Sequence, residues 1–261
     1  MSQKHNTAIQ KQFTRTVDAF SKQAPKDTRE VMEEKAVFAS PQPTDFALDI
    51  ACGPGTLVLS LAPRVRFAIG IDLTHAMLHQ AREFQGQQEI PHAAFAQGEA
   101  ERLPFRDGAF SLATCQAAFH HMLKPESVLE EMVRVMKPDG RLLIIDTLGP
   151  EGEEKWELYN HIEKARDPSH TNSLRLTTFL KLFDDLHLEP ARQSIKKRER
   201  SFDKWMQRAG LARSDPRYRE TRRLLEEAIP GDRAGHSPRV QGDDLVIVHY
   251  EAIFLLKRRM A

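Results

Sequence analysis

The sequence predicts an α/β protein with a parallel sheet and helices packed against it. Between residues 45 and 148, short apolar runs alternate with amphipathic segments, which is the pattern of βαβ units. A length of 261 residues suits one large domain, and apolar residues make up 40% of the chain, enough for a substantial core.

The elements follow one another in a regular order. The first 40 residues are polar, with helical spacing of Phe13, Val17 and Phe20, and the two prolines of Ser40–Thr44 end any helix there. We then expect strands at residues 46–51, 67–72, 93–97, 110–115 and 141–148. Between them we expect helices at 55–61, 74–84 and 125–136, and a turn at 137–140.

The C-terminal part departs from this alternation. Residues 149–187 are mostly polar with helical character, too long for a plain connection, and are interpreted as an insert that caps the substrate. A sixth strand is expected at 188–195, charged helices at 201–228 and a last strand at 245–256.

Composition excludes several classes of protein. Lys plus Arg is 38 and Asp plus Glu is 37, which gives a net charge of +1. The overall charge therefore does not indicate a protein that binds nucleic acid or a membrane surface. Two cysteines make no disulfide framework and no zinc-type cluster, and no metal site is predicted. The N-terminus has no signal-peptide pattern and no apolar run reaches the length of a membrane span, so we expect a cytoplasmic protein.

The sequence Leu-Asp-Ile-Ala-Cys-Gly-Pro-Gly-Thr at residues 48–56 is the first indication of a ligand site. Small residues allow a ligand to approach the backbone, and the start of the following helix offers free N–H groups. A dinucleotide fingerprint requires a third glycine where Val58 stands, and a Walker loop requires a Gly-Lys pair that is absent. A nucleotide-like ligand is predicted without either phosphate-binding pattern.

Asp72 ends the second predicted strand, 19 residues beyond Gly53. A carboxylate in this place can accept two hydrogen bonds from the vicinal hydroxyls of a ribose. The spacing therefore predicts a ribose, and it does not choose between cofactors.

Four ordered motifs resemble class I S-adenosylmethionine-dependent methyltransferases, in particular the ubiquinone/menaquinone biosynthesis group. They are residues 48–56, Gly-Ile-Asp-Leu at 70–73, the Gly-Glu-Ala and Leu-Pro-Phe elements within 97–110, and 115–122. The helix, turn and strand of residues 130–141 are also similar to that family. The resemblance implies a Rossmann-like, seven-stranded, mostly parallel sheet with helices on both faces and an antiparallel last strand. It also implies S-adenosyl-L-methionine as the cofactor.

The resemblance assigns the cofactor contacts residue by residue. Asp72 takes the ribose, while Glu99 and the N–H of Ala100 take the adenine. Gln12-Phe13 resembles part of a leading helix that closes over the cofactor. The full set is Phe13, Asp49, Ala51, Cys52, Gly53, Gly55, Asp72, Leu73, Met77, Gly98, Glu99, Ala100 and Gln116. Two residues depart from the usual pattern, since the family commonly has Gly at Ala51 and Asp at Glu99.

His120 and His121 follow the fourth strand and are the predicted catalytic residues. Methyl transfer from a sulfonium is an in-line displacement that depends on alignment, and a base is needed only where the nucleophile loses a proton. Asp146 is expected to make hydrogen bonds at the end of its strand. The stretch Arg166–His170 receives no role.

These observations predict a methyltransferase acting on a small molecule, as a single domain over residues 1–261. Within it we expect an N-terminal helical lid (1–40), a cofactor-binding core (45–148), a cap (149–187) and a C-terminal part (188–261). The sequence is compatible with a homodimer. One alternative is an NAD oxidoreductase, disfavoured by Val58. Others are a non-catalytic cofactor-binding regulator, or an RNA methyltransferase using residues 191–223, which hold 12 Lys/Arg and 4 Asp/Glu.

Overall fold

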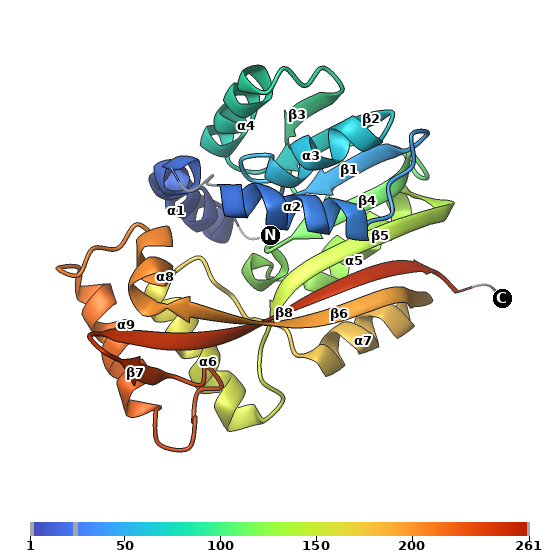
Figure 1. Cartoon of the computed structure of the whole chain (residues 1–261). Coiled ribbons are helices and arrows are strands. Elements are labelled where there is room, and N and C mark those ends of the chain that lie inside the picture. Colours follow the sequence, from blue (N-terminus) through green and yellow to red (C-terminus); the bar gives the residue numbers. More distant parts are fainter. Residues whose placement is uncertain (1–2, 23–25, 260–261) are drawn as a thin grey trace.

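A single twisted sheet runs through the whole molecule in the computed structural model (Figure 1). The structure describes residues 3–22 and 26–259, with the side chains of residues 18–29 outside that description. Phe20, part of the predicted N-terminal helical spacing, is one of those side chains. Two helices, α1 (Gln3–Lys22) and α2 (Lys26–Phe38), occupy the N-terminal region predicted to be helical.

The sheet of the described residues has the order β3-β2-β1-β4-β5-β8-β6, and β7 pairs with β8 beside this path. Neighbours among the first five strands are parallel, and β8 is antiparallel to both β5 and β6. The strands are β1 (Phe46–Ile50), β2 (Phe67–Asp72), β3 (Ala93–Gln97), β4 (Phe110–Gln116), β5 (Met136–Leu148), β6 (Leu188–Ser201), β7 (Arg239–Gln241) and β8 (Asp244–Arg258). The predicted fold class is confirmed.

Two details of the predicted sheet were wrong. The sheet has eight strands instead of seven, because β7 forms a short hairpin with the start of β8. The turn expected at 137–140 lies inside β5, as an irregularity in its pairing with β4. Phe110 pairs with Met136 whereas Leu112 pairs with Arg141, so the Lys-Pro-Asp-Gly segment is accommodated as extra length on one strand.

Helices cover both faces of the sheet, as expected. One apolar cluster packs β strands against α5 and α7, including Leu129, Met132, Phe183 and Phe254. A second cluster packs the opposite face against α2 and α3, including Ala36 and Val58. The remaining helices are α3 (Thr56–Leu61), α4 (His75–Gln87), α5 (Pro125–Val135), α6 (Glu153–Arg166), α7 (Leu176–Asp185), α8 (Phe202–Arg208) and α9 (Pro216–Glu227).

The long strands β6 and β8 extend past the parallel part of the sheet. Their far ends carry α6, α8, α9 and β7, which gather at one end of the molecule (Figure 1). A third apolar cluster holds this end together, with Phe202, Trp205 and Leu225 packed against Leu245 and Ile247 of β8. This end of the molecule, which includes α6 of the predicted cap, is therefore built on the same sheet as the core.

None of the helices in the described part of the chain is both long enough and apolar enough to cross a bilayer.

Candidate active site

The loop between β1 and α3 has a left-handed backbone at three positions. Ala51, Gly53 and Gly55 have φ values of 55°, 53° and 75°. A side chain raises the energy of this conformation, which explains why the family that this sequence resembles usually has glycine at position 51. A Cβ on Gly55 would lie 2.6 Å from the ring of Phe95, whereas a Cβ on Gly53 would meet nothing within 4 Å.

Asp72 ties the tip of β2 to this loop. One carboxylate oxygen accepts the N–H of Gly53 at 2.8 Å and the other accepts the N–H of Thr74 at 2.8 Å. Each oxygen has a second lone pair, so the carboxylate can accept two further hydrogen bonds. Burial raises the pKa of Asp72, and the bonds from Thr74 and Gly53 oppose that rise. The geometry suits capture of a vicinal diol beside the loop.

Asp49 lies behind the loop on β1 and is only 3% exposed. Thr114 of β4 donates its hydroxyl to Asp49 Oδ1 at 2.6 Å. Burial raises the pKa of Asp49 to about 7, and the charge of Asp72 adds to the rise, while the Thr114 bond opposes it. Asp49 is therefore a carboxyl group with a pKa near neutrality.

Asp49→Asn is expected to make the protein more stable at neutral and alkaline pH. The unfolded carboxyl has a pKa of about 3.9, and the folded one about 7. A raised folded pKa contributes stability that is complete below pH ~3.9 and is lost as pH rises through ~7. The free energy of unfolding of the variant should exceed that of the wild type increasingly over this range, by at most about 4 kcal/mol. Urea unfolding at several pH values measures it.

Asp139→Asn is the control, because Asp139 is exposed within the irregular segment of β5. The free energy of unfolding of this control should stay close to that of the wild type. If the difference in unfolding free energy between Asp49→Asn and the wild type does not grow as pH rises, the raised pKa of Asp49 is contradicted.

Helix α1 lies over the ends of β2 and β3. The amide of Asn6 donates to Glu99 Oε1 at 3.1 Å, and the amide of Gln10 donates to the carbonyl of Leu73 at 3.2 Å. Gln97 donates to the same carbonyl at 3.0 Å. The exposed carboxylate of Glu99 and the Leu73 backbone thus meet the N-terminal helix, at the position where the family resemblance predicts the adenine.

The other predicted cofactor residues surround this loop at different depths. Gly98 donates its N–H to the Asp72 carbonyl, and a Cβ there would lie 2.5 Å from Ile71. Ala100, Met77 and Cys52 are buried, and burial raises the pKa of the Cys52 thiol well above its usual range. Gln116 ends β4 with its amide 3.5 Å from the sulfur of Met32 on α2.

His120 forms a close pair with Asp146 at the end of the neighbouring strand. Nδ1 of His120 lies 2.5 Å from Asp146 Oδ1, and the carboxylate also accepts the N–H groups of Ala118, Phe119 and Thr147. Burial lowers the pKa of His120, but the charge and hydrogen bond of Asp146 together raise it by more. The pKa of His120 therefore lies above the usual value for histidine. The imidazole is 19% exposed and the carboxylate 1%.

His121 faces the cap instead. Its Nδ1 lies 3.0 Å from the carbonyl of Ser169, and its ring packs edge-on against Phe13 of α1 at 5.1 Å. Burial, and then the charge of His120, lower the pKa of His121 to about 4. Nε2 of His5 also lies 2.7 Å from the His121 carbonyl. His120 and His121, together called the rim here, thus contact α1 and residues 149–187.

The stretch Arg166–His170, which received no role from sequence, folds onto this rim. Asp167 accepts the N–H and the hydroxyl of Ser169, and Thr171 donates both its N–H and its hydroxyl to the His120 carbonyl. The His170 ring lies 5.5 Å from that of His120. Residues 149–187 thus contact the backbone of His120 and the imidazole of His121.

Comparison with known proteins identifies the core of this arrangement. Residues 48–144, which contain the loop, Asp72, Glu99 and the rim histidines, match the family described as "Methyltransferase domain". Residues 48–144 therefore resemble a methyltransferase domain. The match ends inside β5, before Asp146 and before the cap.

Named relatives agree with this domain. The uncharacterized methyltransferase YcgJ of Bacillus subtilis (strain 168) is 36% identical over 165 residues, 62% of this chain and 64% of that protein. A demethylmenaquinone methyltransferase of Lactobacillus johnsonii is 35% identical over 122 residues, 44% of this chain and 50% of that protein. The chain thus spans less than two thirds of the length of either relative in these alignments.

The structural likeness extends beyond the methyltransferase domain. The crystal structure of YcgJ superposes with a TM-score of 0.80 over 91% of this chain and 100% of that one, at 26% identity. The fold similarity therefore covers more of the chain than the sequence similarity does.

Some candidate residues were missed by the sequence reasoning. Asp146 was expected only as a hydrogen-bonding residue at a strand end, and its pairing with His120 depends on the β4–β5 contact, where Gln116 pairs with Ile145. Asn6, Gln10 and Ser169 carried no local signal, because each reaches the methyltransferase domain from a distant segment.

Proposed function

We propose that the protein transfers a methyl group from S-adenosyl-L-methionine to a small-molecule acceptor. One observation carries the proposal: Asp72 links the left-handed β1–α3 loop to the tip of β2, and Gly53 has open space where a Cβ would point. The open position lets a ligand approach the backbone, and the carboxylate has free lone pairs for a ribose. The cofactor supplies an activated methyl group when it is bound.

The chain's own residues divide into two groups under this proposal. Asp72 holds the ribose, Glu99 and Ala100 hold the adenine, and α1 covers them as a lid through Asn6 and Gln10. His120 faces the acceptor and takes a proton from it, while Asp146 orients the imidazole. Exclusion of water and alignment of the acceptor fall to the lid and the cap.

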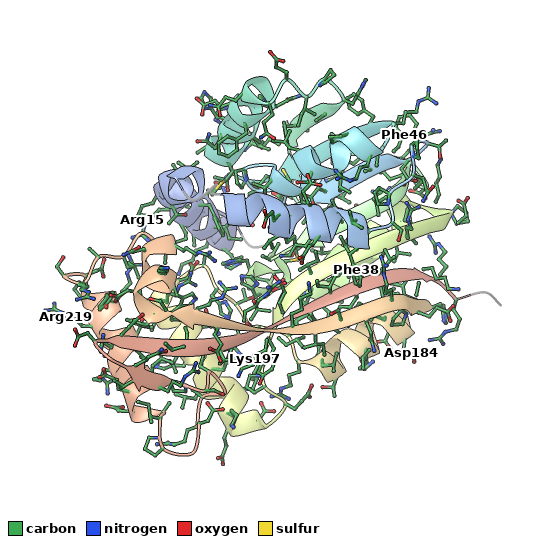
Figure 2. All side chains as sticks on the ribbon, in the orientation of Figure 1. Arg15, Phe38, Phe46, Asp184, Lys197 and Arg219 are labelled. Carbon is green, nitrogen blue, oxygen red and sulfur yellow. The ribbon has the colours of Figure 1, made fainter. Side chains whose placement is uncertain are left out.

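A small acceptor is favoured over RNA by the charges of residues 191–223. Many of the basic side chains there pair with acids, as in Lys196–Glu34, Arg198–Glu251, Arg213–Asp203 and Arg223–Glu220. Lys197 on β6 and Arg219 on α9, labelled in Figure 2, lie far apart on the surface. Paired and scattered charges make a weak electrostatic site for a phosphate backbone.

Calorimetric titration with S-adenosylmethionine, S-adenosylhomocysteine and NAD tests the cofactor. We expect micromolar binding of the two sulfur compounds and no heat with NAD. Methyl transfer is then sought with a panel of small acceptors, starting from hydroquinones, because one relative is named a demethylmenaquinone methyltransferase. Binding without transfer to any acceptor would favour a non-catalytic regulator, and salt-dependent retention of RNA would favour an RNA substrate.

Gly53→Ala is expected to reduce cofactor affinity, whereas Gly55→Ala is expected to reduce stability. Alanine at Gly53 adds about 1–2 kcal/mol of left-handed backbone strain and fills the open space, so cofactor affinity falls while the fold survives. Alanine at Gly55 adds similar strain and a Cβ within 2.6 Å of Phe95, so stability falls by more than about 2 kcal/mol. Calorimetry and urea unfolding separate the two. Wild-type affinity in a folded Gly53→Ala variant would contradict the cofactor placement.

A further inference from the structure

Three polar side chains from distant segments meet inside the C-terminal end of the molecule. Glu163 lies on α6, His236 in the connection between α9 and β7, and His249 on β8. One oxygen of Glu163 lies 2.9 Å from Nε2 of His249 and 3.3 Å from Nε2 of His236. The three ligand atoms all lie within 4.8 Å of one another. The two imidazoles therefore converge on a single carboxylate oxygen.

Aromatic side chains enclose this cluster. Tyr159 stacks on His236 at 4.0 Å with the two rings nearly parallel, and the Trp205 ring lies 5.4 Å from that of His249. His236 is fully buried, and His249 and Glu163 are 4% and 5% exposed. Around them lie the apolar residues that join α6, α8 and α9 to β8. Apolar and aromatic side chains therefore shield these three groups from solvent.

Hydrogen bonding alone leaves this cluster incomplete. Donation from each Nε2 to Glu163 would satisfy one nitrogen per ring, but Nδ1 of His236 and Nδ1 of His249 are buried without a hydrogen-bond partner. A partly satisfied polar network in an apolar interior is less favourable than apolar residues of similar size. A cation shared by the two Nε2 atoms and the carboxylate oxygen would offset part of this cost, with the proton of each imidazole then carried on Nδ1.

We propose that Glu163, His236 and His249 bind a zinc-class divalent transition metal. Two imidazole nitrogens and a carboxylate oxygen are a donor set that zinc accepts, with a fourth position left to water. Metal–ligand bonds of about 2.0–2.1 Å in a tetrahedral site separate neighbouring ligand atoms by about 3.3 Å. The 2.9 and 3.3 Å separations in the structure are close to that spacing. The third separation, between the two Nε2 atoms, is within 4.8 Å.

Such a metal would be structural. It would join α6, the α9–β7 connection and β8 at one point, and so clamp the cap to the sheet. No metal site was predicted from the sequence, which has two cysteines and no short His/Glu motif at these positions. The three ligands are separated by 73 and 13 residues along the chain, so only the fold brings them together.

Metal analysis of the full-length protein, purified without a histidine tag, tests the proposal. We expect about one zinc ion per chain by mass spectrometry, loss of that metal to a strong chelator, and a lower melting temperature after its removal. Adding zinc alone should restore the temperature, and cobalt(II) alone should give the visible absorption of a tetrahedral site. These readouts need neither an acceptor nor methyl-transfer activity.

Variants identify the ligands. His249→Gln and Glu163→Gln should each weaken zinc affinity at least tenfold and abolish the zinc-dependent rise in melting temperature. His161→Gln is the control, because His161 is exposed on the same helix as Glu163 and should leave both quantities unchanged. Wild-type protein that holds no stoichiometric metal and gains no stability from zinc would overturn the proposal, even if the variants do not fold. Unchanged zinc binding in folded ligand variants would also overturn it.

Discussion

Asp72→Ala is expected to weaken S-adenosylmethionine binding by roughly 100-fold while the protein remains folded. The carboxylate accepts the N–H groups of Gly53 and Thr74 and keeps a lone pair on each oxygen for a ribose hydroxyl. Two hydrogen bonds to a charged acceptor contribute about 1.5–3 kcal/mol each, and each 1.4 kcal/mol is tenfold in affinity. Calorimetric titration of the variant measures the loss.

The loss must be separated from damage to the loop. Asp72→Asn keeps an acceptor oxygen but loses the charge, so its affinity should fall between those of the wild type and Asp72→Ala. Asp139→Ala, at an exposed position, should bind as the wild type does. Circular dichroism and the melting temperature confirm that each variant is folded. An Asp72→Ala variant that is folded and binds S-adenosylmethionine normally would place the cofactor elsewhere.

His120→Ala is expected to lower kcat by at least about 100-fold with little change in S-adenosylmethionine affinity. A positioned general base contributes about 10²–10⁴ to the rate, whereas the cofactor contacts lie on other residues. The pair with Asp146 fixes Nδ1, so Nε2 is the nitrogen that can take a proton. The acceptor found by the panel is the substrate for this assay.

The pH profile of Asp146→Asn distinguishes a base from a structural histidine. In the wild type, Asp146 raises the pKa of His120, so activity should fall as pH drops through a value above the usual one for histidine. Removing the charge should lower kcat and move this acidic limb to lower pH. A profile that keeps its position while kcat falls would show that His120 is not the titrating base.

His121→Ala provides the comparison within the rim. If His121 contacts the acceptor, turnover should fall more than cofactor affinity in this variant. Stability should fall as well, because the variant loses the contact with Ser169 and the packing against Phe13. Equal losses of turnover and affinity would identify His121 as structural.

The arrangement of the β1–α3 loop and Asp72 was largely predictable from the sequence. The small-residue loop and Asp72 belong to one strand–loop–helix–strand unit, so a local pattern places them together. The parallel sheet followed from the alternation of apolar runs and helices for the same reason. β7 was missed because its residues, Arg239–Gln241, are all exposed and have no apolar alternation.

The arrangement around His120 and His121 could not be predicted to the same degree. Its arrangement depends on contacts between segments that are far apart, such as Thr171 with His120 and His5 with the His121 backbone. Asp146 meets His120 only because β4 and β5 are adjacent and in a particular register. A one-residue shift in that register would turn the carboxylate to the other face of the sheet.

The position of β8 has a consequence for how the protein folds. This strand comes last among those described, yet it lies inside the sheet between β5 and β6. β6 therefore has no place to dock until residues 244–258 have been made. The pairing of Arg141 with Lys257 also joins residues more than 100 positions apart, which slows folding through the entropy of closing a long loop. During synthesis, the apolar edge of β5 would stay uncovered until the ribosome releases this segment, so chaperone demand should be greatest for chains truncated before β8.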